Sequence, residues 1–127
     1  MKISIIGAGS FGSALTELAT RCGNEVMLWA HDSRVAEAIS ETRSNPFYLP
    51  AAQFTDQVHV TNSLATAAAF SDTLVMVTPS HHFRGVLGTI RESLTGPVNI
   101  ISATKGIEND SLKRMSEVAS EVLDGRL

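Results

Sequence analysis

The chain has 127 residues, of which 43% are apolar and 18% charged, as is typical of one compact globular domain. The formal net charge of −3 excludes a basic surface for nucleic acid, and no apolar run approaches the about 20 residues that a membrane span needs. There is no signal peptide pattern and only one cysteine, Cys22, which excludes an internal disulfide, so we expect a cytoplasmic protein.

Short apolar runs alternate along the chain with longer segments in which apolar residues recur at helical spacing. In chain order the pattern predicts strand 3–6, helix 11–21, strand 25–30, helix 33–42, a loop with two prolines over 44–57, strand 58–60, helix 63–70, strand 73–78, helix 80–94, strand 98–103 and helix 111–123. The candidate N-caps of three of these helices are Ser33, Asn62 or Ser63, and Ser111.

Five strands alternating with five helices imply a parallel sheet, because parallel neighbours must be joined by crossover connections. Right-handed crossovers then predict a doubly wound α/β fold of the Rossmann type, with helices on both faces of the sheet. In such sheets a ligand lies beyond the carboxyl ends of the strands where the strand order reverses, here between the first and fourth strands. We therefore expect residues 7–12, 77–80 and 104–106 to face one crevice.

The first predicted strand ends in Gly7-Ala8-Gly9-Ser10-Phe11-Gly12, a G-x-G-x-x-G sequence. A strand precedes it, a helix begins within it and a second strand follows, which is the context that dinucleotide binding requires. Gly7 permits the tight turn, Gly9 lets the backbone approach a pyrophosphate, and Gly12 lets the helix pack closely on the strand. The free N–H groups and positive dipole end of the helix would then attract the phosphates.

Lys105 follows the fifth predicted strand, so its cation would point into the same crevice, where it can bind a phosphate or stabilise negative charge on a substrate oxygen. Other conspicuous residues have structural interpretations. Cys22 is expected in the core, Trp29 in the core with a partner for its indole N–H, and the charges of the last predicted helix on a solvated face. His81 and His82 are adjacent and lack further ligands, so a metal site is not predicted.

Five stretches of the chain, in order, resemble the N-terminal domain of bacterial-type NAD(P)-dependent glycerol-3-phosphate dehydrogenases. They are residues 7–15, 28–32 (Leu-Trp-Ala-His-Asp), 45–50 (Asn-Pro-Phe-Tyr-Leu-Pro), 77–81 (Val-Thr-Pro-Ser-His) and 102–108 (Ser-Ala-Thr-Lys-Gly-Ile-Glu). Many dehydrogenases share the glycine turn, whereas the loop 45–50 and the stretch 102–108 are much more particular to this family. Together the five stretches span nearly the whole chain.

The resemblance implies that Ser10, Phe11, His31, Tyr48 and Lys105 contact the dinucleotide, and that Lys105 also meets a phosphorylated substrate. Members of the family interconvert sn-glycerol 3-phosphate and dihydroxyacetone phosphate and so supply the backbone of phospholipids. Their proton-transferring lysine lies in a helical C-terminal domain, which this sequence does not contain. We therefore expect residues 1–127 to be the dinucleotide-binding domain of a longer enzyme that could form a homodimer, with no catalytic residue of its own.

The end of the second predicted strand, residues 29–32, bears on the choice of coenzyme. Strand register puts Ala30 where NAD-binding sheets usually carry a carboxylate for the ribose, although Asp32 lies at about the usual spacing of ~20 residues from the third glycine. Without that carboxylate a 2′-phosphate is not repelled, and His31 can donate hydrogen bonds to it, with Arg34 nearby. We expect NADP(H) to be preferred over NAD(H).

Two other functions fit the same fold. The first is another two-domain dehydrogenase that acts on a hydroxy acid, against which the Tyr-Leu-Pro loop and Lys105 both argue. The second is a non-catalytic module that senses the redox state of a nucleotide, which would bind the coenzyme without a second domain. A following helical domain in the reading frame would favour the enzyme.

Overall fold

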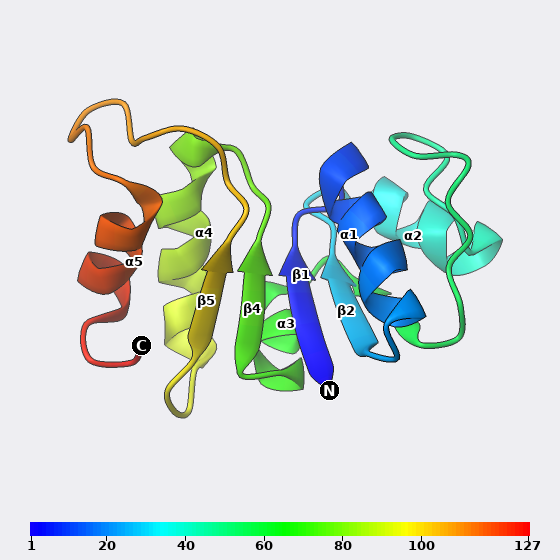
Figure 1. The fold of residues 1–127 in the computed structure, drawn as a ribbon, viewed down its shortest axis with the longest axis horizontal. Helices are drawn as coiled ribbons and strands as arrows, with labels where there is room; N and C mark the ends of the chain where they lie inside the picture. The colour runs from blue at the N-terminus through cyan, green and yellow to red at the C-terminus, as the bar shows by residue number, and fades with distance from the viewer.

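The computed structural model describes all residues from 1 to 127, which form a five-stranded parallel sheet between two helical layers (Figure 1). The strands are β1 (Lys2–Ile6), β2 (Glu25–Trp29), β3 (Val58–Thr61), β4 (Thr73–Met76) and β5 (Asn99–Ser102). The helices are α1 (Ser10–Arg21), α2 (Ser33–Thr42), α3 (Leu64–Phe70), α4 (Ser80–Ser93) and α5 (Met115–Leu123). No helix of this fold combines the length and the apolar character that crossing a bilayer requires.

The order of the strands is β3-β2-β1-β4-β5, and every neighbouring pair is parallel. This confirms the predicted doubly wound sheet, with the order reversing between β1 and β4. Ile6 lies opposite both Trp29 on β2 and Met76 on β4, so the three strands end at the same level. The loops that follow them therefore begin along one edge of the sheet, at the reversal point.

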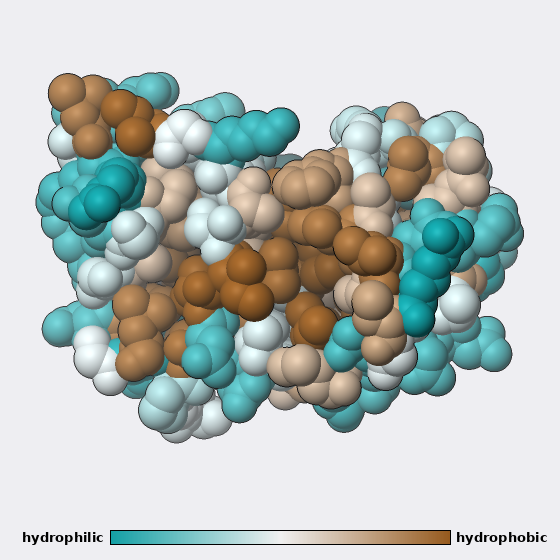
Figure 2. Space-filling view, viewed as in Figure 1, coloured by the Kyte–Doolittle hydropathy of each residue, from teal (hydrophilic) through white to brown (hydrophobic).

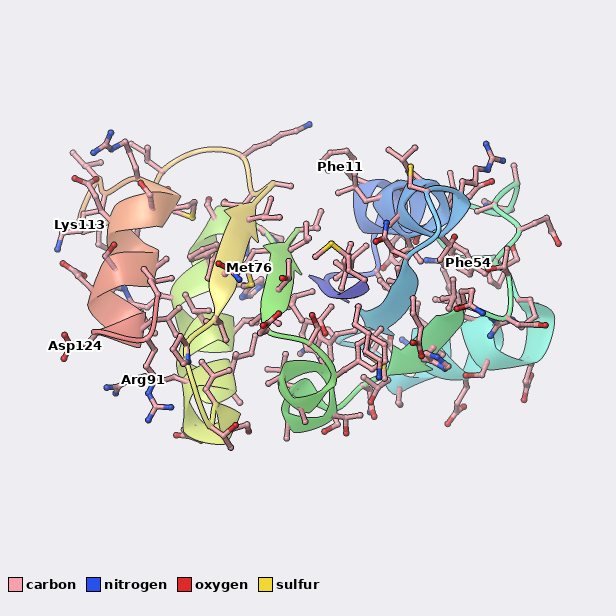
Figure 3. The ribbon with its side chains drawn as sticks, turned by 60° about the horizontal axis from the view of Figure 1, so that its bottom comes forward. Phe11, Phe54, Met76, Arg91, Lys113 and Asp124 are labelled. Atoms are coloured by element: carbon pink, nitrogen blue, oxygen red, sulfur yellow. The ribbon has the colours of Figure 1, made fainter.

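Each face of the sheet has its own apolar core. Helices α3, α4 and α5 pack on one face, where Phe83, Leu87 and Ile90 of α4 are fully buried together with Met76 of the sheet. Helices α1 and α2 lie on the opposite face, which Figure 1 shows in front, and there Phe54 of the long loop joins the core. Figure 3 labels Met76 and Phe54 in these two regions. Full burial of one such side chain stabilises the fold by about 1.5–3 kcal/mol.

Helix α1 buries small and hydroxyl-bearing residues most fully against the sheet, while its apolar residues Leu15 and Ala19 pack there only partly buried. Its buried positions are Gly12, Ser13, Thr16 and Thr20. Thr16 donates its hydroxyl to the Gly12 carbonyl at 2.9 Å, and Thr20 donates to the Thr16 carbonyl at 3.1 Å, so the buried oxygens are satisfied. Leu18 is correspondingly left 57% exposed.

No helix covers β5 on the face that carries α1, and apolar side chains gather there over the middle of the molecule (Figure 2). Ile101 on β5 is 54% exposed. Val75 and Val77, on β4 and just beyond it, are only partly buried. The sheet is thus enclosed on both faces near β1 and β2, but on one face only at β5.

Two helix starts differ from the prediction. The N-cap of α2 is Asp32 and not Ser33, because the Asp32 carboxylate accepts the backbone N–H of Arg34. Helix α5 begins at Met115, four residues after the predicted cap Ser111. The Ser111 hydroxyl is donated to the Glu108 carboxylate instead, and the next residue, Leu112, has a φ of 58° that no right-handed helix tolerates. The predicted cap Ser63 of α3 is confirmed, since its hydroxyl accepts the Thr66 N–H.

The backbone of α1 approaches that of β1 closely where the helix leaves the glycine turn. A Cβ atom at Gly12 would lie 1.8 Å from the carbonyl oxygen of Gly7, which is far inside contact distance. Gly7 itself has a φ of 128°, and a Cβ there would meet the backbone of Val77 at 2.9 Å. These two glycines therefore let β1, α1 and the end of β4 come together at one point.

We expect Gly12→Ala to lower the free energy of unfolding by about 3 kcal/mol or more, because the turn must open to admit the methyl group. Urea unfolding followed by circular dichroism measures the effect. Gly85→Ala is the matched control, since this exposed glycine of α4 has no atom within 4 Å of its would-be Cβ. That change should stabilise the protein by about 0.5–1 kcal/mol. Equal effects of the two variants would contradict the packing argument.

Candidate dinucleotide site

The glycine turn presents unpaired backbone donors at the start of α1. Gly9 is the N-cap of this helix, with an extended backbone, and no side chain caps the helix. The first N–H of α1 to be paired near the cap is that of Ser13, which donates to the Gly9 carbonyl. A Cβ at Gly9 would meet no protein atom within 4 Å, so the surface in front of the turn is open. An anion can therefore approach the free N–H groups and the positive end of the helix.

Asn45 holds this turn from the side of the long loop. Its side chain is fully buried and donates through Nδ2 to the Ala8 carbonyl and to the Ser13 hydroxyl, both at 2.9 Å. Its Oδ1 accepts the backbone N–H of Tyr48 at 3.2 Å. Ser10 in turn donates its hydroxyl to the Tyr48 carbonyl at 2.8 Å. The loop 45–50 is thus fixed against the turn, and Tyr48 stands beside the start of α1.

A cleft of about 680 Å³ opens at the carboxyl ends of β1, β2, β4 and β5, as expected from the reversal of strand order. Its volume lies within the range of small-molecule and cofactor sites. All eight residues predicted to bind the dinucleotide line it: Gly7, Gly9, Ser10, Phe11, Gly12, His31, Tyr48 and Lys105. The segments 77–79 and 103–105 line the same cleft, so the structure brings together strand ends far apart in sequence.

The end of β2 forms one wall of the cleft. The His31 side chain is exposed there, and its ring meets that of Trp29 edge to face with 5.8 Å between their centroids. The Asp32 carboxylate does not face the cleft freely, because it caps α2 and also receives the Arg34 guanidinium, with Nη2 to Oδ2 at 2.7 Å. Hydrogen bonding to Arg34 lowers the pKa of Asp32 below its ordinary value. Asp32 and Arg34 therefore satisfy each other, which leaves His31 as the free polar side chain of this wall.

Lys105 stands at the opposite wall, beyond the end of β5. Its Nζ lies 5.8 Å from the centre of the ring of Phe11, a lining residue of the cleft that is labelled in Figure 3 at the start of α1. The residue before it, Thr104, donates its hydroxyl to the Met76 carbonyl at the end of β4. The residue after it, Gly106, has a φ of 95° and approaches the Ser80 hydroxyl at the start of α4. The Lys105 ammonium therefore lies near the start of α1, on the side of β5.

A set of ion pairs connects Glu108, three residues after Lys105, with helices α4 and α5. The Arg84 guanidinium of α4 forms two hydrogen bonds to the Glu108 carboxylate, from Nε at 2.8 Å and from Nη2 at 2.9 Å. Arg84 also reaches Glu121 of α5 at 2.9 Å, and Lys113 pairs with Glu121 as well. Ser111 adds a hydrogen bond to Glu108 at 2.6 Å. The guanidinium and this hydroxyl lower the pKa of Glu108 from 4.5 to about 2.

A family model described as the N-terminus of NAD-dependent glycerol-3-phosphate dehydrogenase matches residues 2–127, nearly the whole chain. The chain belongs to this family. The glycine turn, the loop 45–50 and Lys105 all lie within the match. The resemblance seen in the sequence is therefore confirmed, and it covers the residues that line the cleft.

Curated relatives support the same family assignment. A glycerol-3-phosphate dehydrogenase [NAD(P)+] of Geobacter sulfurreducens is 41% identical over 122 residues, which are 96% of this chain and 36% of the relative. One from Escherichia coli is 37% identical over 126 residues, 99% of this chain and 37% of the relative. The chain thus spans little more than a third of the length of the curated relatives that it matches.

Solved structures show the same correspondence. The glycerol-3-phosphate dehydrogenase of Coxiella burnetii superposes with a TM-score of 0.90 at 28% identity, covering 96% of this chain and 37% of that one. A ketopantoate reductase of Ralstonia eutropha superposes with a TM-score of 0.75 at 22% identity, over 98% of this chain and 39% of that one, and so shares the fold.

Two predictions about individual residues are wrong in whole or in part. Cys22 is exposed and not part of the core, because α1 faces the sheet with Gly12 and its hydroxyl residues. Trp29 is buried, but its indole N–H has no hydrogen-bond partner. The charged residues assigned to one solvated helical face are divided, since Arg114, Glu117 and Glu121 are exposed as predicted, whereas Glu108 and Lys113 are half-buried and precede α5. No group of three or more His, Cys, Asp and Glu residues is arranged to hold a metal ion.

Sequence reasoning also missed residues that shape the site. Asn45 and Arg84 were not singled out, since their partners are distant in sequence. Val86 of α4 lines the cleft together with His82, and their spacing of four residues on one helix could have identified Val86 as sharing a face with that histidine.

The pKa of Glu108 predicts how stability responds to acid. Because the folded-state pKa of about 2 lies below the ordinary value of 4.5, this carboxylate stabilises the fold fully above pH 4.5 and loses that contribution as the pH falls toward 2. Glu108→Gln should therefore lose less unfolding free energy than wild type between these pH values. Urea unfolding at several pH values tests this, with Glu92→Gln, at an exposed position of α4, as the control. Parallel curves for Glu108→Gln and wild type would contradict it.

Proposed function

We propose that residues 1–127 are the dinucleotide-binding domain of an NAD(P)-dependent oxidoreductase that interconverts sn-glycerol 3-phosphate and dihydroxyacetone phosphate. The observation that carries this proposal is the cleft itself, where an open glycine turn faces Lys105 at the reversal point of the sheet. The matched family and the names of the relatives supply the substrate class.

The residues of the chain fit a dinucleotide. Gly9 leaves open the space that a pyrophosphate would fill, and the unpaired N–H groups of α1 are aimed at that space. Lys105 would supply a cation to phosphate groups and to negative charge on the substrate oxygen. When bound, the nicotinamide supplies hydride transfer to or from the carbon that bears the secondary hydroxyl. The proton-transferring group is expected outside these residues, so the chain alone would bind without turnover.

We further propose NADP(H) as the preferred coenzyme. The support is the wall at β2, where Ala30 has no carboxylate and the Asp32 carboxylate is occupied by Arg34. His31 is the exposed donor that remains for a 2′-phosphate. Our proposal also includes a cytoplasmic enzyme that serves phospholipid synthesis and could act as a homodimer, which follows from the family resemblance.

Titration of the complete gene product with NADPH and with NADH tests the coenzyme proposal, using the fluorescence of the reduced nicotinamide. NADPH should bind more tightly. His31→Ala should raise the Kd for NADPH by about tenfold, the loss of one charge-assisted hydrogen bond, and leave the Kd for NADH unchanged. His59→Ala, on the distant edge strand β3, is the matched control. Tighter binding of NADH, or equal losses for both coenzymes, would overturn the assignment.

Lys105→Ala in the complete gene product should lower kcat/KM for dihydroxyacetone phosphate by about a hundredfold to a thousandfold, as for other lost electrostatic contacts to a transition state. The exposed Lys2, at the far end of β1, gives a control of equal charge change in Lys2→Ala. A steady-state assay of NADPH oxidation measures both variants. If Lys105→Ala keeps near-normal activity, Lys105 is not part of the site.

A further inference from the structure

Lys105 is carried by a segment that is fixed at its ends rather than along its length. Between β5 and α5, residues 103–114 form neither helix nor strand. Ala103 and Thr104 are hydrogen-bonded to the Met76 carbonyl, at 2.9 and 3.3 Å. Lys105 and Gly106 then donate no backbone hydrogen bond, and Ile107 pairs with Arg114 in an isolated antiparallel bridge. Ile107 and Glu108 are the next fixed residues, two and three positions beyond Lys105, so the path of the Lys105 backbone depends on where they are held.

The Glu108 carboxylate is held by Arg84 and, locally, by the Ser111 hydroxyl. Its side chain is 17% exposed, and the two parallel hydrogen bonds from Arg84 fix both the position and the orientation of its carboxylate. The backbone of Glu108 adds local bonds, since its N–H donates to the Lys113 carbonyl and its carbonyl accepts from Leu112. Those local bonds and the bridge between Ile107 and Arg114 connect this part of the segment to the start of α5. Among the side-chain contacts of Glu108, only those of Arg84 attach it to α4.

Helix α4 also contributes to the cleft directly. Pro79, His82 and Val86, at its start and on one of its sides, line the cleft. Arg84 stands on the same two turns of the helix but reaches the Lys105 segment instead. One rigid helix therefore fixes a wall of the cleft and, through Arg84, the far end of the segment that brings in Lys105.

We propose that Arg84 is a positioning residue for Lys105: its paired hydrogen bonds to Glu108 set the place of the Lys105 backbone relative to the glycine turn. This inference rests on the proposed role of Lys105 at the dinucleotide and substrate phosphates. Arg84 touches neither ligand in this arrangement, and its effect passes through Glu108. The planar fork of arginine matters, because a lysine ammonium cannot bind both carboxylate oxygens in the same geometry.

The test is a double-mutant cycle in the complete gene product, with the Kd for NADPH, kcat/KM for dihydroxyacetone phosphate, and the thermal midpoint as readouts. The variants are Arg84→Gln, Glu108→Gln and Arg84→Lys, each alone and combined with Lys105→Ala. Arg91→Gln, which removes the same charge two turns along α4, is the matched control and should match wild type. Arg84→Gln and Glu108→Gln should each lower kcat/KM by about tenfold, since small displacements of a reacting group are costly.

The decisive readout is the effect of Arg84→Gln in the Lys105→Ala background. If Arg84 acts through Lys105, it should lower kcat/KM by less than about twofold once Lys105 is gone. An equal loss in both backgrounds would show a general structural role and overturn the inference. Wild-type kinetics for Arg84→Gln would also overturn it, provided that Lys105→Ala is impaired.

The remaining outcomes are also decisive. If Lys105→Ala itself has normal kinetics, the proposed function of Lys105 fails, and the inference fails with it. Should Arg84→Gln not fold, Arg84→Lys provides the same comparison, because it retains the charge and loses the fork. It should show a smaller loss that also disappears in the Lys105→Ala background. A loss for Arg84→Lys that persists there would contradict the proposal.

Discussion

The contact between Gly12 and the carbonyl of Gly7 is the constraint on which the arrangement of the site depends. Only a residue without a Cβ fits there, since that atom would lie 1.8 Å from the carbonyl oxygen. The contact brings the first turn of α1 onto the end of β1, so the helix must face the sheet with small and hydroxyl-bearing residues such as Thr16. It also leaves Phe11 at the cleft, because this residue lies at the helix start and turns away from the sheet.

The end of β2 illustrates how one carboxylate can have a structural use in place of the expected ligand contact. Asp32 lies at the sequence spacing of a ribose-binding acid, but its oxygens accept the N–H of Arg34 and the guanidinium of the same residue. A helix cap satisfies an otherwise unpaired donor and favours negative charge at the N-terminus of α2. The polar group that remains available to a ligand at this wall of the cleft is therefore the His31 imidazole.

Sequence reasoning located all ten elements, because apolar periodicity and turn residues are local signals. It placed the cleft correctly, since parallel strands joined by right-handed crossovers leave one reversal point. It failed where the outcome depends on particular hydrogen bonds, distant or local, that apolar periodicity does not encode. Asn45 meets Ala8 and Ser13 from 37 and 32 positions away, and the late start of α5 follows from local bonds around Glu108 that no helical pattern reveals.

The glycine turn and the Lys105 wall of the cleft are held in place by different kinds of interaction, and this difference has a physical consequence. At the glycine turn, Asn45 is uncharged and fully buried, so its hydrogen bonds are not screened by salt. At the Lys105 wall, Arg84 is 42% exposed and acts through charge, so its hold on Glu108 weakens as ionic strength rises. The dinucleotide phosphates would thus meet a backbone turn of fixed geometry on one side. On the other side they would meet a cation whose position responds to the solution.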